Sequence, residues 1–351
     1  MTTSSDGRIR LGFFTRLLDD GTALQRYRNA LDQFVRAEEL GLDSVWVAQH
    51  HFHEDEGGLP SPFVLLAQAA ARTSHIHLAT GIVTLPLEAP LRVAEDAAVL
   101  QLLSDGRLEL GIGSGGTPSS FPPFGLESAD RAAIYDRHRE LLVSALRGDV
   151  LTSDAGRLYP AAPDLLGRIW EATFSAGGAE RIGRRGNGLM LSRTQPRQTW
   201  DGPTSPELQE GIVDAYLAAL PDGVEPRILA SRSALVVDTA EDAQRWIQRG
   251  IERSAGYLRS QHIEVPEGVS DTELLEWLDV HVGTAEQVLA SLQKDGVLAR
   301  ATDVAFQPHP IDPTHDAVLR SLELIATRVA PDLLGWSPDH VREPVLTKGT
   351  L

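Results

Sequence analysis

Apolar runs alternate along this chain with apolar positions at helical spacing. Residues 9–15 form a compact apolar run, and residues 24–35 carry apolar side chains at positions 24, 27, 31, 34 and 35. A short apolar run predicts a buried strand, whereas apolar side chains three or four residues apart predict one face of a helix. The start of the chain therefore predicts a strand, a loop and a helix.

The same unit recurs through the whole chain. Further strands are predicted at residues 44–48, 76–85, 107–112, 169–174, 189–192, 228–237 and 302–307. One of the helices between them opens with Pro60 and Pro62, whose fixed φ suits a first turn. Eight such units in succession, most with short connections, favour a closed (β/α)8 barrel over a doubly wound sheet. We predict an α/β protein, a (β/α)8 TIM barrel with insertions.

The chain length and the pattern predict one main domain. We expect a single barrel domain at residues 8–333, a disordered tail at residues 1–7 and a C-terminal tail at residues 334–351. Two segments do not fit a simple unit of strand, loop and helix. They are residues 193–226, which five prolines interrupt, and residues 265–282, which carry one short helix. Excursions that follow barrel strands build the walls of the site, so we expect these insertions to determine the substrate.

The net charge of the chain limits the classes of molecule that it is expected to bind. The chain has 32 Lys and Arg residues against 49 Asp and Glu residues, which gives a formal net charge of −17. An acidic protein repels phosphate backbones, which argues against nucleic acid and anionic membrane surfaces as general partners. The N-terminus has no apolar signal region, and the longest apolar stretch, near residues 64–71, is shorter than the roughly 20 residues of a spanning helix. We expect a cytoplasmic protein with a small-molecule substrate.

The absence of cysteine limits the catalytic groups and metal sites that the chain can form. The chain has no Cys, which excludes disulfides, thiolate nucleophiles, iron–sulfur clusters and Cys-ligated zinc. Histidines, carboxylates and hydroxyls remain, and redox chemistry would require a bound cofactor.

Polar and glycine-rich clusters follow the predicted strands. They are Gln49 to His51 after the second strand, Gly113 to Gly116 after the fourth, Ser175 to Gly178 after the fifth, and Gln307 with His309 after the eighth. The carboxyl ends of barrel strands converge on one mouth, where the chemistry of this fold is found. The sequence therefore predicts a functional site at that mouth.

The segment from Ser175 to Gly178 stands between a strand and a helix expected to begin near Ala179. Its free backbone N–H groups and the positive end of the helix dipole would suit a phosphate. A glycine-permitted tight turn explains the same residues equally well.

The segment GIGSGG, residues 111–116, is also rich in glycine. It is neither a Walker loop nor a complete dinucleotide fingerprint, because the residues that should follow are absent. Residues without side chains at a strand end would let a flat ring lie close to the backbone. A plain loop is the alternative.

The segment QHHFHEDE gathers imidazoles and carboxylates. Neighbouring residues at a strand end point to opposite faces, so His50 and His51 are not expected to hold one ion together, and we predict no metal site. We expect one imidazole to face the mouth as an acid, a base or a hydrogen-bond donor, and the other to be structural.

Four segments together resemble the bacterial luciferase-like family of flavin-dependent monooxygenases. They are AEELGLDSVWVAQHHF, HLATGIVTLP, APLRVAEDAAVLQLLSDGRLELGIGSG and VGTAEQVLASL. The resemblance covers about residues 8–332 and is strongest up to Gly125. It implies a (β/α)8 barrel that takes reduced FMN, or the deazaflavin F420, as a dissociable cosubstrate at the carboxyl ends of the strands. The FMN-dependent members oxygenate small organic substrates with O₂.

The resemblance also implies roles for individual residues. His50 matches the first His of the family's Glu-His-His and would assist proton transfer. Gly81 and Ile82 match a site where the family often has a non-prolyl cis peptide bond against the flavin ring. The phosphate-gripping turn corresponds to Ser175, Ala176, Gly177 and Gly178, and Arg131 matches a basic residue close to that phosphate.

Two positions depart from the family pattern. Gln49 stands where the family usually has the Glu before His50, which removes a charge beside the imidazole. Gly113 and Ser114, which we expect beside the cofactor, replace the Cys-Arg pair of the luciferase α subunit. The light-emitting reaction with an aldehyde is therefore not implied.

The function we expect is an FMN-dependent monooxygenase. No nicotinamide-binding fingerprint is visible, so a separate flavin reductase would supply the reduced FMN. An F420-dependent hydride-transfer oxidoreductase and a non-catalytic flavin-binding protein remain as alternatives, and a metal-dependent barrel hydrolase is a more distant one. The resemblance also implies a homodimer that pairs through helices next to the second and third strands.

Overall fold

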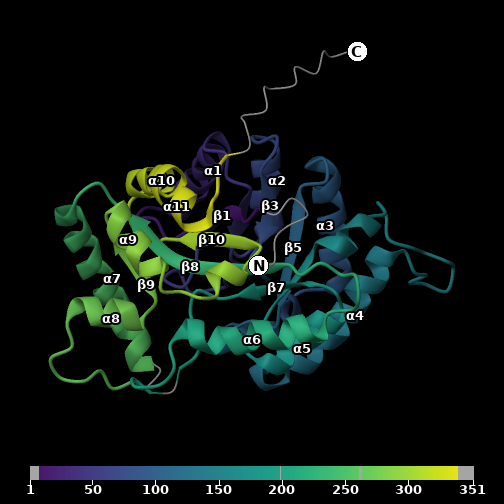
Figure 1. The fold of residues 1–351 in the computed structure, drawn as a ribbon. Coiled ribbons are helices and arrows are strands. Elements are labelled where there is room, and N and C mark those ends of the chain that lie inside the picture. Colours follow the sequence, from purple (N-terminus) through teal and green to yellow (C-terminus); the bar gives the residue numbers. More distant parts are fainter. Residues whose placement is uncertain (1–7, 198, 261–262, 339–351) are drawn as a thin grey trace, which may run out of the picture.

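The computed structural model describes residues 8–197, 199–260 and 263–338 (Figure 1). The tail expected at residues 1–7, and residues 339–351 of the C-terminal tail, lie outside the described residues. Figure 1 shows helices arranged around a central ring of strands.

The ring consists of eight parallel strand positions and is closed. The strands are β1 (Arg10–Thr15), β2 (Ser44–Val47), β3 (His77–Thr80), β4 (Val83–Thr84), β5 (Leu108–Gly113), β6 (Ile169–Ala172), β7 (Gly188–Leu191), β8 (Ile228–Val236), β9 (Val280–Gly283) and β10 (Asp303–Gln307). The order β1-β2-β3-β5-β6-β7-β8 is completed by β10, which pairs with both β8 and β1. Short β4 follows β3 and pairs with β5, and β9 pairs with the far end of β8. The predicted (β/α)8 barrel is confirmed.

The helices are α1 (Ala23–Glu39), α2 (Pro62–Ala70), α3 (Pro90–Leu103), α4 (Arg131–Arg147), α5 (Ala176–Arg184), α6 (Ser205–Ala219), α7 (Ala240–Ser260), α8 (Asp271–Trp277), α9 (Ala285–Leu292), α10 (His315–Leu324) and α11 (Ala330–Leu334). Several begin at a Thr or Ser that caps the first turn, with Gln or Glu three residues later. Such reciprocal capping satisfies N–H groups that have no partner within the helix. Among the helices of the described residues, none has the length and hydrophobicity to cross a membrane.

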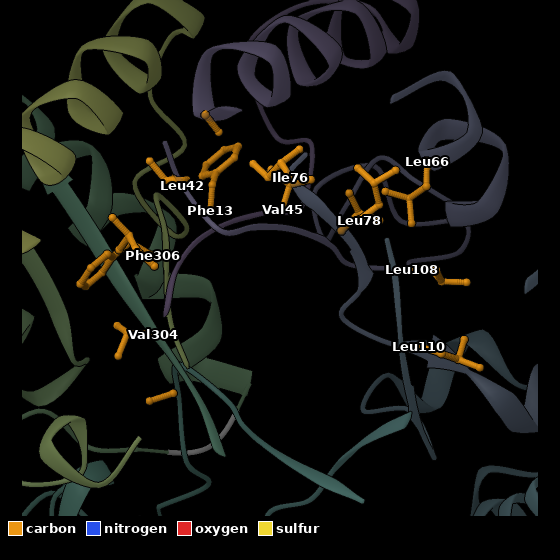
Figure 2. Packing of buried hydrophobic residues seen from close by; sticks show 14 of the residues in the cluster. Phe13, Leu42, Val45, Leu66, Ile76, Leu78, Leu108, Leu110, Val304 and Phe306 are labelled. Carbon is orange, nitrogen blue, oxygen red and sulfur yellow. The ribbon is translucent and has the colours of Figure 1, made fainter. Parts of the chain in front are cut away.

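The strands are predominantly apolar because one face is covered by the helices and the other lies inside the barrel. Phe13, Leu78 and Val304 point outward toward the helices, where Leu66 of α2 lies in the same cluster (Figure 2). Inward-facing Trp46 and Trp170 meet edge to face inside the barrel, with ring centroids 5.6 Å apart. Parallel strands buried on both sides have this composition, which explains why the apolar runs predicted them.

Part of the expected insertion at residues 193–226 is a regular barrel helix. The structure places α6 there, capped by Thr204 and Glu207. The prolines did not prevent this helix, because Pro206 lies in the first turn, where a missing N–H costs no hydrogen bond. The excursion after β7 is therefore shorter than expected. The short helix predicted within residues 265–282 is confirmed as α8.

The C-terminal tail expected from residue 334 begins later than predicted. Leu334 completes α11, and Trp336 is only 1% exposed. The indole N–H of Trp336 donates a hydrogen bond to a carboxylate oxygen of Asp43 at 3.0 Å. Since Asp43 immediately precedes β2, this contact ties the end of the described chain to the amino end of the barrel.

Candidate active site

A cavity of about 1120 Å³ opens at the carboxyl ends of the barrel strands. Its lining residues belong to or follow the strands of the ring, from Phe14 in β1 and Arg16 directly after it to Gln307 at the end of β10 and His309 beyond it. This volume is slightly above the roughly 300–1,000 Å³ that is usual for small-molecule sites. The cavity therefore has room for a cofactor together with a substrate.

The cavity brings together most of the residues predicted from sequence. Those that line it are His50, Gly81, Ile82, Gly113, Ser114 and Arg131. Residues 175–178 do not line it, but they directly follow Thr173 and Phe174, which do. The predicted site residues therefore lie in, or at the rim of, one opening.

The inner wall of the cavity is an apolar shelf, which consists of Phe14, Ala48, Ile82, Ala172, Met190 and Leu229. The peptide bond between Gly81 and Ile82 is cis, as expected from the resemblance. A Cβ atom on Gly81 would lie 2.5 Å from the Phe14 ring, and one on Gly113 would lie 2.2 Å from Cδ1 of Ile82. Glycine at these two positions therefore lets the shelf pack closely, which agrees with the steric interpretation of the glycine segment.

The turn at residues 175–178 begins helix α5. The helix starts at Ala176, earlier than the predicted start near Ala179, because the hydroxyl of Ser175 caps it by accepting a hydrogen bond from the Gly178 N–H at 3.2 Å. The first N–H groups of a helix have no partner within it, and here they belong to Ala176 and Gly177. A Cβ atom on Gly177 would meet only the far end of Arg181, at 3.9 Å, so there is open space beside this turn.

His50 is held by a residue that the motif analysis missed. Arg16 donates a hydrogen bond to Nε2 of His50 at 2.8 Å. A guanidinium only donates, so Nε2 accepts and the proton of the neutral ring is on Nδ1. Burial, together with the charge of Arg16, holds the pKa of His50 well below its usual value. His50 is therefore a neutral imidazole whose buried Nδ1 has no partner within the described residues.

His51 lines the cavity as well, which corrects the expectation that one of the two imidazoles would be structural. The chain leaves extended geometry after Val47, so strand alternation no longer separates the two side chains. The His51 ring packs edge-on against Phe124, with centroids 5.1 Å apart. Its Nε2 atom has no hydrogen-bond partner in the described part of the chain.

Gln49 has a structural role that depends on its amide. Its Nε2 donates to a carboxylate oxygen of Glu88 at 2.6 Å, and its Oε1 accepts from the Thr84 N–H at 2.7 Å. A carboxylate at this position could not donate to Glu88 and would place two negative charges together. In this chain, therefore, an amide suits the place beside Glu88 better than a second carboxylate would.

A second group of polar residues lies where β10 ends. Nδ1 of His309 is 2.9 Å from a carboxylate oxygen of Asp312, and Arg253 of α7 forms an ion pair with the same carboxylate at 2.7 Å. Burial, and next the charge of Arg16, lowers the pKa of His309 to about 3. The sequence pointed to His309 by its place after a strand, but Arg253 stands inside a helix and gave no such signal.

Glu171 connects the two helices whose first turns border the cavity. Its buried carboxylate accepts hydrogen bonds from Tyr135 at 2.6 Å and Arg139 at 3.1 Å, both on α4, and from Arg185 at the end of α5 at 2.8 Å. Burial raises the pKa of the Tyr135 phenol well above its usual value, and the charge of Glu171 acts in the same direction. Glu171 therefore fixes α4, which begins at Arg131, relative to α5.

A metal centre has no support in the side chains that can be placed. Within residues 8–197, 199–260 and 263–338, no three or more His, Cys, Asp or Glu side chains are grouped so that they could hold an ion.

Comparisons with known proteins agree with this architecture. The family model described as luciferase-like monooxygenase matches residues 8–345. The oxygenase component of flavin-dependent trigonelline monooxygenase from Acinetobacter baylyi is 26% identical over 65% of this chain and 64% of its own length. An F420-dependent glucose-6-phosphate dehydrogenase from Beutenbergia cavernae is 32% identical over 57% of this chain and 64% of its own length.

The fold is also that of a solved structure with bound FMN. The oxygenating constituent of 3,6-diketocamphane monooxygenase from Pseudomonas putida superimposes with a TM-score of 0.69. The match covers 93% of this chain and 99% of that protein, at 20% sequence identity.

Proposed function

The chain belongs to the luciferase-like monooxygenase family, and on this basis we propose that it is an FMN-dependent monooxygenase that oxygenates a small organic substrate with O₂. The observation that carries the proposal is a single cavity that joins the apolar shelf at Ile82 to Arg131 and lies beside the first turn of α5. An apolar wall and a cationic rim are what a flavin mononucleotide requires at its two ends.

The residues of the cavity fit FMN. The shelf around Ile82 would hold the flat ring, with Gly113 and Ser114 at its edge. The N–H groups of Ala176 and Gly177 and the open space beside Gly177 would take the phosphate, together with Ser175 and Gly178. Arg131 lies exposed at the rim and, within the described part of the chain, donates to Ser128 alone, so its guanidinium has N–H groups left for the phosphate. Bound reduced FMN would supply the electrons that activate O₂.

His50 would act as a hydrogen-bond donor and hold a proton at Nδ1. Because Arg16 occupies Nε2, the tautomer of His50 is fixed before any ligand arrives. The His50 side chain lines the cavity, and its Nδ1–H, which packs against Gly57, would have to turn toward the ligand to donate to a developing negative charge on the reacting atoms. The shelf would exclude water from the same region.

A separate reductase would provide the reduced FMN. The support for this is the absence of a nicotinamide fingerprint in the sequence and the similarity to a protein named as an oxygenase component. An F420-dependent hydride-transfer reaction is the second candidate, favoured by the similarity to F420-dependent glucose-6-phosphate dehydrogenases. Both cofactors carry a phosphate that the turn at residues 175–178 could take.

We also propose that the protein is a homodimer that pairs through α2 and α3. Side chains exposed on these helices include several large apolar groups: Val64 at 68%, Val99 at 45%, Leu102 at 59% and Leu103 at 64%. Scattered exposed apolar residues are ordinary, but a group on neighbouring helices is typical of an interface.

The decisive experiment compares the two cofactors in the same preparation. Titration with FMN, reduced FMN and F420, followed by rapid mixing of the reduced complex with O₂, should show tighter binding of reduced FMN and an oxygen-dependent flavin intermediate. Tighter binding of F420 would select the second candidate. Flavin binding with no reaction in the presence of any substrate tried would instead support a flavin-binding protein without turnover.

A further inference from the structure

The charged residues of the cavity have the opposite balance to the chain as a whole. The chain carries a net charge of −17, yet four arginines and only two carboxylate residues line the cavity. The arginines are Arg16, Arg131, Arg193 and Arg253. Cations gathered in a cleft with low-dielectric walls attract anionic ligands.

These arginines lie on different sides of the opening. Arg131 belongs to the side of β6, where we place the cofactor phosphate. Arg16 follows β1, which is four strand positions from β6 in either direction around the ring. Arg16 therefore follows the strand opposite the phosphate turn in the ring. Near it, Asp312 balances part of the charge of Arg16 and Arg253.

Arg16 makes no direct contact with a carboxylate among the described residues, although the charges of Asp312 and Glu56 act on it. Its hydrogen bonds in the described residues go to the carbonyl oxygen of Glu56 at 2.7 Å and to Nε2 of His50, and neither acceptor is charged. Arg253 shares Asp312 with His309, and its side chain is 37% exposed toward the opening. A largely buried guanidinium without a directly bound carboxylate is rare unless a ligand completes the site.

Buried polar atoms on the same side also lack partners among the residues that the structure describes. There the hydroxyl of Ser254, which is 2% exposed, makes no hydrogen bond, and Gln307, which is 4% exposed, uses Nε2 for Ser231 but leaves Oε1 unpaired. Nδ1 of His50 is a third such atom; it packs against Gly57, and all three side chains line the cavity. An unpaired buried polar group is costly, so a polar ligand beside Ser254 and Gln307 would explain why these groups are retained.

We propose that this side of the cavity is a carboxylate-binding subsite, in which Arg16, Arg253 and Ser254 hold the acid group of a small organic acid substrate. The proposal rests on the proposed function, because the acid is the molecule to be oxygenated. The carboxylate would accept from the two guanidinium groups and the hydroxyl. Gln307 Oε1 would accept from a hydroxyl or N–H elsewhere on the same molecule.

The test uses calorimetric titration of the full-length protein, with and without FMN. The probes are benzoate and hexanoate, with benzamide and hexanamide as neutral matches of the same shape. The carboxylates should bind about tenfold or more tightly than the amides, since hydrogen bonds to a charged group are the stronger ones. Arg16→Gln and Arg253→Gln should each reduce carboxylate affinity about tenfold. Arg249→Gln, which removes a surface partner of Asp20 one turn earlier on α7, should change nothing.

The outcomes separate the subsite from the cofactor. Arg131→Gln should weaken FMN binding and leave benzoate binding intact, whereas Arg16→Gln should do the reverse.

Equal binding of acids and amides, or no binding of either acid at millimolar concentration, would overturn the subsite. Competition between benzoate and FMN would overturn it too, because it would assign these arginines to the cofactor. If FMN fails to bind while acids are still preferred over amides, the proposed function fails and the subsite stands. If Arg16→Gln does not fold, Arg253→Gln still tests the subsite, because the Arg253 side chain on α7 is partly exposed and its loss should leave the fold intact.

Discussion

Arg16, at the end of β1, donates a hydrogen bond to Nε2 of His50, at the end of β2, across a distance of 2.8 Å. The contact joins neighbouring strands of the barrel at the point where both reach the cavity. It determines which nitrogen of His50 carries the proton, so the direction in which the imidazole can donate is fixed by a neighbouring cation. The first prediction follows from this pair.

Replacement of His50 should impair turnover without impairing cofactor binding. His50→Ala removes two groups: the acceptor Nε2, which binds Arg16, and the donor Nδ1–H. We therefore expect the rate of product formation to fall about 100-fold. FMN affinity, measured by fluorescence titration, should stay within a few-fold of the wild-type value. His53→Ala is the matched control, because His53 belongs to the same loop but does not line the cavity. A variant that retains full turnover would remove His50 from the mechanism.

Added bulk at Gly113 should disturb the shelf. Gly113→Ala places a methyl carbon 2.2 Å from Cδ1 of Ile82, and overpacking of this kind costs about 1–3 kcal/mol. Urea unfolding should show the loss of stability, and FMN affinity should fall as Ile82 is displaced. Gly116→Ala is the control, because a Cβ atom there meets no atom within 4 Å. Equal effects of the two substitutions would contradict the steric role of Gly113.

Loss of the Glu171 charge should loosen the cofactor side of the cavity. Glu171→Gln leaves Arg139 and Arg185 without their buried carboxylate, which should cost about 3 kcal/mol. FMN should bind more weakly because α4 and α5 are no longer held together, and added benzoate should not restore the affinity. Glu180→Gln breaks only a surface pair with Arg184 and should be nearly neutral.

Acid should destabilise the protein partly through His281. This histidine lies on β9 beside Ser291, and burial, with the charge of Arg232, lowers its pKa to about 4. The folded pKa is below the unfolded value of about 6.5, so the unfolded chain binds the proton first. Stability is therefore lost as pH falls from about 6.5 to about 4, with a slope near 1 kcal/mol per pH unit from this group. His281→Gln should unfold in urea with a weaker pH dependence in that window and the same dependence above it.

Charge on α3 should prevent pairing. Leu103→Glu places a carboxylate on the apolar face of α2 and α3, and light scattering should then show a monomer at concentrations where we expect the wild-type chain to be dimeric. Leu24→Glu, on exposed α1 away from that face, should leave the mass unchanged. A wild-type monomer would refute the proposed interface outright.

The barrel could be predicted from sequence because each strand is covered on both faces. Strands such as β2 are apolar without interruption, so they stand out from the amphipathic helices that follow. The sequence did not predict helix α6, because the prolines of this segment indicated irregular structure. Pro206 lies in the first turn of the helix, where proline is tolerated. The start of α5 was placed too late because Gly177 and Gly178 are poor helix formers, and the cap by Ser175 outweighs them.

The site was predicted where residues follow strands and missed where they do not form a motif. His50 and Arg131 were found through the family resemblance. Arg16 follows β1 directly, and the same rule of strand ends that selected His309 could have selected it. Arg253 could not be found, because its approach to the cavity depends on how α7 packs over the barrel.

Trp336 has a consequence for how the chain can be rearranged. Its contact with Asp43, and the hydrogen bond from Arg8 to the carbonyl of Ser337 at 2.6 Å, bring the two limits of the described chain together at the amino end of the barrel. Chains whose ends meet on one side tolerate circular permutation. A short linker between these ends, with new termini opened in a surface loop, should give an enzyme whose ligand entrance keeps its present shape.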